Sequence, residues 1–413
     1  MDQQLRLGTE GYSPAVLRKA VRQAGKAASF QDASDDLKEL AQVVISPQHL
    51  GKVAERIGRE WAVARDADVQ AFRANRLAAT YAEPPQVATV SLDGGRVQTR
   101  AADGERGVRQ PGWHEVKVVC CQTLSSKVHA ADPQPEPPSK FLDPAQAARL
   151  AAEVKARGGA AQARTGAAAP PPKRHRRRKG RRSPRPRKLV RTVVASMADS
   201  ETFGWQMAAE VQRRGLDRAQ RKGYICDGQK YNWTLFELHL LAWGFLGILD
   251  FLHLLAYLYG AAQAVAGKGT PAAWALYERW LRWAWSGQVK ELLAGLRAGA
   301  AKLGPAPPGC SDEDPRKIVA DAVGYVENNR SRMDYPRYRQ LGLPISSAPV
   351  ESVIKQVNRR MKGTEKFWVE GGAEAVLQIR AAYLSEDGRA ERYWSRPRGY
   401  APAVGAGRLR PAV

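Results

Sequence analysis

Short apolar, β-branched runs interrupt helical patterns along this chain, and their order constrains the fold more than any other sequence feature. Three come early, within VATVSLDGGRVQTR, WHEVKVVCCQTL and LVRTVVASM, and two later ones, YICD and FLGILD, each lead into a helical pattern. Such runs, bounded by Gly and Pro, are typical of strands. In the first we expect a strand, a turn at Gly94-Gly95 and a second strand. Strands combined with later helices predict a mixed α/β domain.

Residues 1–83 show a helical pattern throughout. Apolar residues recur there at the spacing of one helix face, and Ser46-Pro47 matches an N-cap followed by a proline in the first turn. Pro84-Pro85 ends the pattern. We therefore expect an all-helical N-terminal domain before the strands.

Residues 131–188 are of low complexity and rich in Pro, Ala, Gly and Arg. This composition predicts a disordered insertion, with a short helix at 144–157. The part from Lys173 to Lys188 carries eleven Lys or Arg and no acidic residue. It fits a flexible arm that binds DNA phosphates without reading sequence, and equally a charged loop without a specific partner. The candidate contacts of such an arm include Lys173, Arg176, Arg177 and Arg178.

The charge balance indicates a polyanionic partner. Sixty-five Lys and Arg against 41 Asp and Glu give a net charge of +24 over 413 residues. DNA, RNA and anionic membrane surfaces are the candidates. The four cysteines lack the spacing of a zinc site and suit a reducing cytoplasm. We expect no signal peptide, and no membrane span at 240–259, because Asp250 and His253 interrupt that apolar stretch.

Three acidic residues are candidates for the carboxylate ligands that a metal-dependent nuclease needs. Asp93 in VSLDGG and Asp227 in YICDGQ each follow a strand-like run and precede glycine, and Glu351 lies in a predicted helix. Carboxylate oxygens are the ligands that Mg²⁺ prefers. Each residue also has an ordinary interpretation. An Asp-Gly after a strand is usually a turn, and a Glu among lysines is usually on a solvated helix face.

The longer phrases around these residues resemble the DDE transposases of bacterial insertion sequences, in the ISKra-type group related to Mutator-like elements. The resemblance covers roughly residues 87–384 and is carried by VSLDGGRVQTR, GWHEVKVV, KLVRTVVASMADSETFG, YICDGQKYNW, ILDFLHLLAYLY, VENNRSRMDYPRYRQLGLPISSAPVES and KQVNRRMKGTEKFW. The chain departs from that family in its long low-complexity stretch and in ILDFLH, where the family has ILDFYH.

The resemblance implies an RNase H-like catalytic domain in two parts, 86–260 and 340–395, separated by a helical insertion at 262–335 and followed by a flexible tail at 396–413. It implies that Asp93, Asp227 and Glu351 are catalytic and bind two Mg²⁺ or Mn²⁺ ions. Asp250 and His253 match a supporting D-x-x-H signature, and their i, i+3 spacing equally suits a hydrogen bond that only stabilises the fold. The function implied is cleavage and transfer of DNA strands by a cytoplasmic, nucleoid-associated homo-oligomer, without a membrane or a small-molecule cofactor.

Basic and polar residues near the third acid are candidate contacts to the element ends and the target DNA. They are Lys355, Asn358, Arg359, Arg360 and Lys362 after Glu351, and Arg332, Arg337 and Arg339 before it. Residues 1–83 are a second candidate for binding the DNA ends. The tryptophans of 274–285 fit a helical core better than base stacking. Three alternatives to a transposase remain open: an RNase H-like nuclease without strand transfer, a decayed DNA-binding relic, and a membrane-associated protein.

Overall fold

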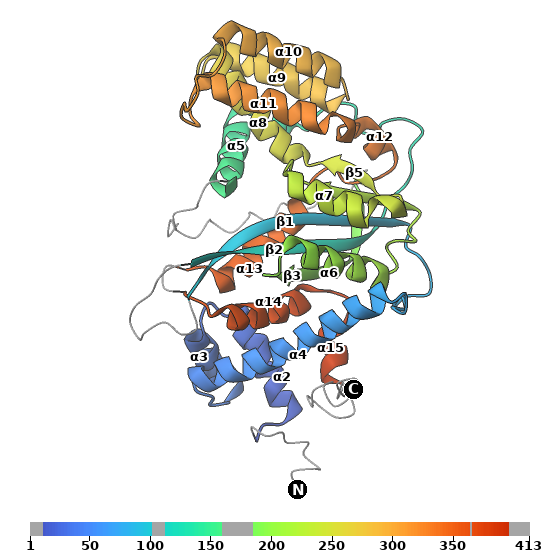
Figure 1. Cartoon of the computed structure of the whole chain (residues 1–413), viewed down its shortest axis with the longest axis vertical. Coiled ribbons are helices and arrows are strands. Elements are labelled where there is room, and N and C mark those ends of the chain that lie inside the picture. The colour runs from blue at the N-terminus through green and yellow to red at the C-terminus, as the bar shows by residue number, and fades with distance from the viewer. Residues whose placement is uncertain (1–10, 101–111, 159–184, 364–365, 396–413) are drawn as a thin grey trace.

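Five strands form one mixed sheet at the centre of the structure, with helices on both faces and at both ends (Figure 1). The computed structural model describes residues 11–100, 112–158, 185–363 and 366–395. The strand order is β3-β2-β1-β4-β5; β1–β2 and β2–β3 pair antiparallel, and β1–β4 and β4–β5 pair parallel. The predicted α/β class is confirmed. The strands are β1 Val87–Thr99, β2 Gly112–Ser125, β3 Arg187–Ser196, β4 Arg221–Cys226 and β5 Leu246–Leu249.

Helices make up most of the remaining described chain. Those longer than one turn are α2 Pro14–Lys26, α3 Phe30–Ala41, α4 Pro47–Arg73, α5 Pro144–Gly158, α6 Ser200–Arg213, α7 Lys230–His239, α8 Phe251–Ala266, α9 Pro271–Trp285, α10 Val289–Leu303, α11 Pro315–Asn329, α12 Tyr335–Gln340, α13 Ala348–Met361, α14 Glu370–Leu384 and α15 Arg389–Trp394. Three single 3₁₀ turns are η1 Ser139–Phe141, η2 Leu241–Trp243 and η3 Arg330–Arg332.

β1 continues without a break through Gly94-Gly95, so the prediction of a turn at these glycines is wrong. The strand pairs with β2 from Val87↔Leu124 to Thr99↔Gly112 without a shift in register. The unbroken ladder with β2 outweighs the preference of a Gly-Gly pair for a turn, and the amide of Gly94 donates to Asp93 Oδ1 (2.7 Å). Asp93 therefore lies inside a strand rather than at its end.

The sheet is buried on both faces, because helices from different parts of the chain cover each of them. α6 and α7 pack on the face that carries Leu92 and Val194. α13 and α14 pack on the opposite face, against Val118 and Val193. Double burial explains why the strands read as nearly continuous apolar runs. Three of the four cysteines are buried in this region as free thiols, and Cys310 is half-buried.

The N-terminal helices share a core with the end of the chain. α2, α3 and α4 begin where Ser-Pro and Ser signals place their N-caps, as Ser46 does for α4. Their apolar faces pack together with Ile379 of α14 and with Tyr393 and Trp394 of α15. Figure 1 shows these five helices grouped at one end of the molecule. The helices are thus as predicted, but their buried surface is completed by α14 and α15.

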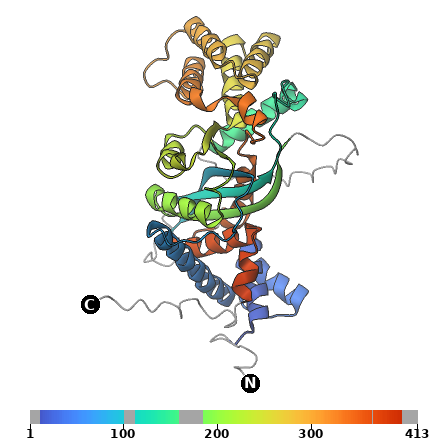
Figure 2. The same cartoon turned by 90° about the vertical axis from the view of Figure 1, so that its right-hand side faces the viewer.

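A second group of helices, α8 to α11, lies at the opposite end of the molecule, as Figures 1 and 2 both show. Trp280 and Trp285 are buried there and Trp274 and Trp283 are partly buried, so the predicted helical core is confirmed. The apolar stretch at 240–259 divides into η2, β5 and the start of α8. No helix in the described part of the chain has the length and apolar character needed to cross a bilayer.

Part of the segment expected to be disordered is ordered. Residues 131–158 contain η1 and α5, and α5 packs against α8. Phe141 and Ala147 are buried in the main core, and Arg339 forms an ion pair with Asp132. These apolar anchors outweigh the Pro-rich composition around them. The helix expected at 144–157 is confirmed as α5. The basic residues Lys173, Arg176, Arg177 and Arg178 lie outside the described residues.

Candidate metal centre

The register of the parallel strands brings three acidic residues to one edge of the sheet. The pairing of β1 with β4 ends at Leu92↔Cys226, and the pairing of β4 with β5 ends at Cys226↔Leu249. Asp93, Asp227 and Asp250 are the next residues on the three strands. Ligand sites of α/β sheets lie beyond the carboxyl ends of parallel strands. The three acids therefore follow one another across this edge, with Asp227 in the middle.

Glu351 reaches the same edge from α13. The apolar face of this helix, which includes Val350 and Val353, packs on the sheet and fixes the direction of the neighbouring Glu351. Ser347, just before the helix, links two acids: its amide donates to Asp250 Oδ1 (3.0 Å) and its hydroxyl donates to Glu351 Oε1 (3.4 Å). The first turn of α13 is thereby connected to the end of β5.

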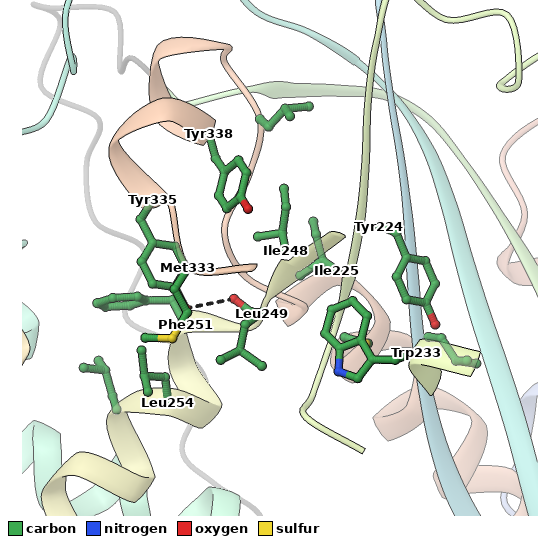
Figure 3. Packing of buried hydrophobic residues seen from close by; sticks show 14 of the residues in the cluster. Tyr224, Ile225, Trp233, Ile248, Leu249, Phe251, Leu254, Met333, Tyr335 and Tyr338 are labelled. Atoms are coloured by element: carbon green, nitrogen blue, oxygen red, sulfur yellow. Dashed lines mark hydrogen bonds between the residues drawn. The ribbon is translucent and has the colours of Figure 1, made fainter. Parts of the chain in front are cut away.

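Asp250 and His253 form the pair that their spacing predicts. His253 Nδ1 is hydrogen-bonded to Asp250 Oδ2 at 2.5 Å, and Asp250 also caps α8 by accepting from the amide of Leu252. A residue of α12, outside the sheet, contacts the end of the edge strand β5. Tyr335 donates to the carbonyl of Leu249 (3.1 Å), and its ring packs in the core shown in Figure 3. Asp250 thus follows a strand whose last carbonyl is fixed.

Within the described residues, one set of three has potential ligand atoms all within 4.8 Å of one another: Asp250, His253 and Glu351. Asp93 and Asp227 are not members of this set. The ionisation of these two residues nevertheless depends on the set. The charges of His253 and Glu351 act on Asp93, and those of His253 and Asp250 act on Asp227. The structure therefore gathers all five predicted residues in one region.

The carboxylates at this edge oppose one another's ionisation. Burial raises the pKa of Asp93 to about 7, and the charge of Asp227 contributes to the increase. Burial also raises the pKa of Asp227, although the charge of His253 and a hydrogen bond from Asn232 (2.7 Å) act in the opposite direction. Such mutual repulsion in a partly dry site is the condition that a bound cation relieves.

The Asp250–His253 pair has the opposite electrostatic character. Burial alone would lower the pKa of His253, but the hydrogen bond and charge of Asp250, with Asp227 and Glu351 beyond, raise it to about 9. Burial would raise the pKa of Asp250, but His253 and the Ser347 amide lower it overall. At neutral pH the pair is an imidazolium beside a carboxylate, and it supplies part of the positive charge in the site.

The donor set fits a hard divalent cation. Asp93 and Asp227 are half-buried, and carboxylate oxygens are the ligands that Mg²⁺ and Mn²⁺ accept. Asp250 is fully buried, and its oxygens already accept from Leu252, Ser347 and His253, which suits a positioning role. A second donor set is His253 with Glu351: the imidazole would bind the cation through Nε2 after losing the proton on that atom, while Asp250 holds Nδ1. Glu351 could therefore bind a cation either with Asp93 and Asp227 or with His253.

Sequence reasoning missed several residues at this site. The phenol of Tyr231 lies near Asp93, Asp227 and Glu115, whose charges help raise its pKa after burial itself. Asn232 donates to Asp227 Oδ1, as does the more distant amide of Gln229 (3.3 Å). Tyr231 and Asn232 both lie in the sequence CDGQKYN. The start of a helix soon after Asp227 was the sequence signal that could have placed them near its carboxylate. Glu115 lies on β2 and gave no signal, because only the strand register brings it there.

The predicted DNA contacts separate into exposed and buried groups. Lys355, Arg359 and Arg337 are exposed, and Asn358 and Lys362 are half-buried. Lys355, Asn358 and Lys362 recur at the spacing of the Glu351 face of α13. The remaining three contact other parts of the chain: Arg360 donates to the carbonyl of Ala24, Arg339 pairs with Asp132, and Arg332 lies 4.0 Å from the ring centroid of Trp233. Arg360 and Arg339 are too deeply buried to touch DNA in this conformation.

Comparison with protein-family models and with curated proteins finds no match to this chain. A proposal for its function therefore depends on the chemistry of the acidic site and the charge of the chain.

Proposed function

We propose that this chain is a DNA transposase that cleaves and joins DNA strands at a metal centre formed by Asp93, Asp227 and Glu351. The observation that carries the proposal is the meeting of acidic residues from β1, β4 and α13 at one sheet edge, in a chain with a net charge of +24. The mixed five-stranded sheet supports an RNase H-like catalytic domain, and the group α9 to α11 corresponds to its helical insertion. We assign DNA-end binding to α2, α3 and α4.

The residues have distinct roles in this proposal. Two divalent ions bound by Asp93, Asp227 and Glu351 would activate the entering oxygen and stabilise the leaving one. Asn232 holds the carboxylate of Asp227, and Ser347 holds those of Asp250 and Glu351. Asp250 orients His253 toward the acids. Lys355, Asn358 and Lys362 extend from Glu351 along α13 and would contact phosphates of the bound strand.

The direct test uses the DNA that flanks the gene. A duplex oligonucleotide carrying the expected element end is incubated with the full chain and a second, target duplex, in Mg²⁺ or in EDTA. We expect a nick at the element end and a joined product in Mg²⁺ only. Cleavage without joining would identify a nuclease, and no cleavage in either Mg²⁺ or Mn²⁺ would contradict the proposal.

Gly228 is predicted to be necessary for the position of Asp227. A Cβ atom at Gly228 would lie 2.3 Å from Cε2 of Tyr325, whose ring is stacked on Tyr257 at 4.0 Å and cannot easily move. Gly228→Ala should therefore displace the loop after β4 and lower the cleavage rate by about a hundredfold, as misplacement by about 1 Å does in other enzymes. Gly371→Ala is the control, because a Cβ there meets nothing within 4 Å. Wild-type rates for Gly228→Ala would show that this contact does not position Asp227.

A further inference from the structure

A cavity of about 330 Å³ borders the two chain segments that carry Asp250, His253 and Glu351. Its wall includes Phe251 and Leu252, which separate Asp250 from His253, and Ala348 and Pro349, which precede Glu351. The amide of Phe251 donates to the carbonyl of Ile345 (3.0 Å), so two of the wall segments are hydrogen-bonded to each other. The volume is within the range of small-molecule sites.

The floor of the cavity is aromatic. Phe251 packs edge-on against Trp285 with ring centroids 5.0 Å apart, and Phe141 lies 5.8 Å from Phe251. Tyr335 packs edge-on against the Phe251 ring with centroids 4.9 Å apart, and Figure 3 shows the two residues in the same cluster. Most of the remaining lining is proline and aliphatic side chains. Lys140 Nζ lies 4.6 Å from the ring centroid of Phe141, and the guanidinium carbon of Arg339 lies 4.1 Å from that of Trp285. A flat ring that carries an anionic group is therefore the kind of ligand that this floor accepts.

The polar side of the cavity is cationic. Lys140, Arg185 and Arg339 line it, and no carboxylate does so among the described residues. Burial lowers the pKa of Lys140, and the nearby charge of Arg185 adds to the effect. Arg339 is 93% buried, since its exposed fraction is 7%, and its Nη1 has no hydrogen-bond partner within the described chain. The charge of Arg339 is already paired with Asp132, whereas the nearby charges of Lys140 and Arg185 repel each other and favour an anion between them.

We propose that this cavity binds one unpaired nucleotide of the DNA strand beside the cleavage site, with its base against Phe251 and its phosphate near Lys140 and Arg185. This inference rests on the proposed function and adds a substrate contact to it. An aromatic floor beside a cationic side matches the two parts of a nucleotide, and the shared wall places it next to the acids. A base bound there is turned out of the duplex, because stacked bases cannot enter a cavity of this shape.

The test measures affinity in EDTA, so that no cleavage is involved. Fluorescence anisotropy compares a labelled single-stranded 12-mer with the same strand containing abasic positions. We expect the wild-type chain to prefer the strand with bases by about tenfold, the size expected for stacking of one base. Ala348→Trp places a large ring in the cavity at an exposed helix start and should remove that preference. Ala272→Trp, at the exposed start of α9, should retain it.

A second pair of variants tests the phosphate. Lys140→Ala should reduce the log–log salt dependence of binding by about 0.7, the contribution of one phosphate in a single strand, for both strands equally. Lys290→Ala, an exposed lysine of α10, is the matched control. Equal affinity of the wild type for both strands, or a base preference that survives Ala348→Trp, would overturn the inference. Either outcome leaves the metal-dependent cleavage assay, and with it the proposed function, to be judged separately.

Discussion

Asp227→Asn should abolish DNA cleavage and strand joining while leaving DNA binding intact. Asp227 lies between Asp93 and Asp250 at the sheet edge, and its charge acts on Asp93. Loss of one carboxylate ligand removes several kcal/mol of transition-state stabilisation, so the rate should fall by about a thousandfold or more. The measurement is the initial rate of cleavage of the element-end duplex in Mg²⁺, with binding measured by anisotropy in EDTA.

The substitution should not unfold the chain. Asn at this position keeps an oxygen that accepts from Asn232, and it removes a charge whose pKa burial raises. Asp312→Asn is the matched control, because Asp312 is exposed and forms an ion pair with Lys317 of α11. Its rate should equal that of the wild type. Cleavage by Asp227→Asn at more than a tenth of the wild-type rate would exclude Asp227 from the catalytic set.

Gly58→Ala should lower the free energy of unfolding by about 3 kcal/mol, at the upper end of what overpacking costs. A Cβ atom at Gly58 of α4 would lie 2.2 Å from the carbonyl oxygen of Ala375 and 2.7 Å from its Cα. These are backbone atoms of α14, so no side-chain rotation relieves the clash, and the two helices must separate. The shared core of α2, α4, α14 and α15 would open as a result.

Gly324→Ala is the control for helix propensity. Gly324 lies inside α11, and a Cβ there meets nothing within 4 Å. Alanine should stabilise this helix by about 0.5–1 kcal/mol. Both variants are compared with the wild type by urea unfolding followed by tryptophan fluorescence. Equal stability of Gly58→Ala and the wild type would mean that the N-terminal helices do not pack on α14 in solution.

Much of the fold could be predicted, because its signals are local. The strands were recognisable as β-branched runs, and the segment at 240–259 was expected to contain a strand followed by a helix because the run FLGILD leads into a helical pattern. The turn at Gly94-Gly95 failed as a prediction because a distant strand, β2, supplies the ladder that keeps β1 straight. The order of residues 131–158 was missed because its anchors, such as Phe141, bury against helices far away in the sequence.

The candidate site also combines contacts that the sequence could predict with contacts that it could not. The i, i+3 contact of Asp250 with His253 followed from spacing alone, and the 2.5 Å hydrogen bond confirms it. The nearness of Asp93 to Asp227 was inferred only through the family resemblance; the physical reason is the register Leu92↔Cys226. The contact of Tyr325 with Gly228 joins α11 to the loop after β4, and no local pattern in the sequence carries that information.

The central claim is that Asp93, Asp227 and Glu351 bind divalent ions together, and anomalous diffraction from crystals soaked in Mn²⁺ tests it most directly. We predict strong anomalous density in contact with oxygens of all three residues, and its loss in crystals of Asp227→Asn. Density confined to His253, Glu351 and Asp250, or an absence of density at this edge of the sheet, would contradict the claim.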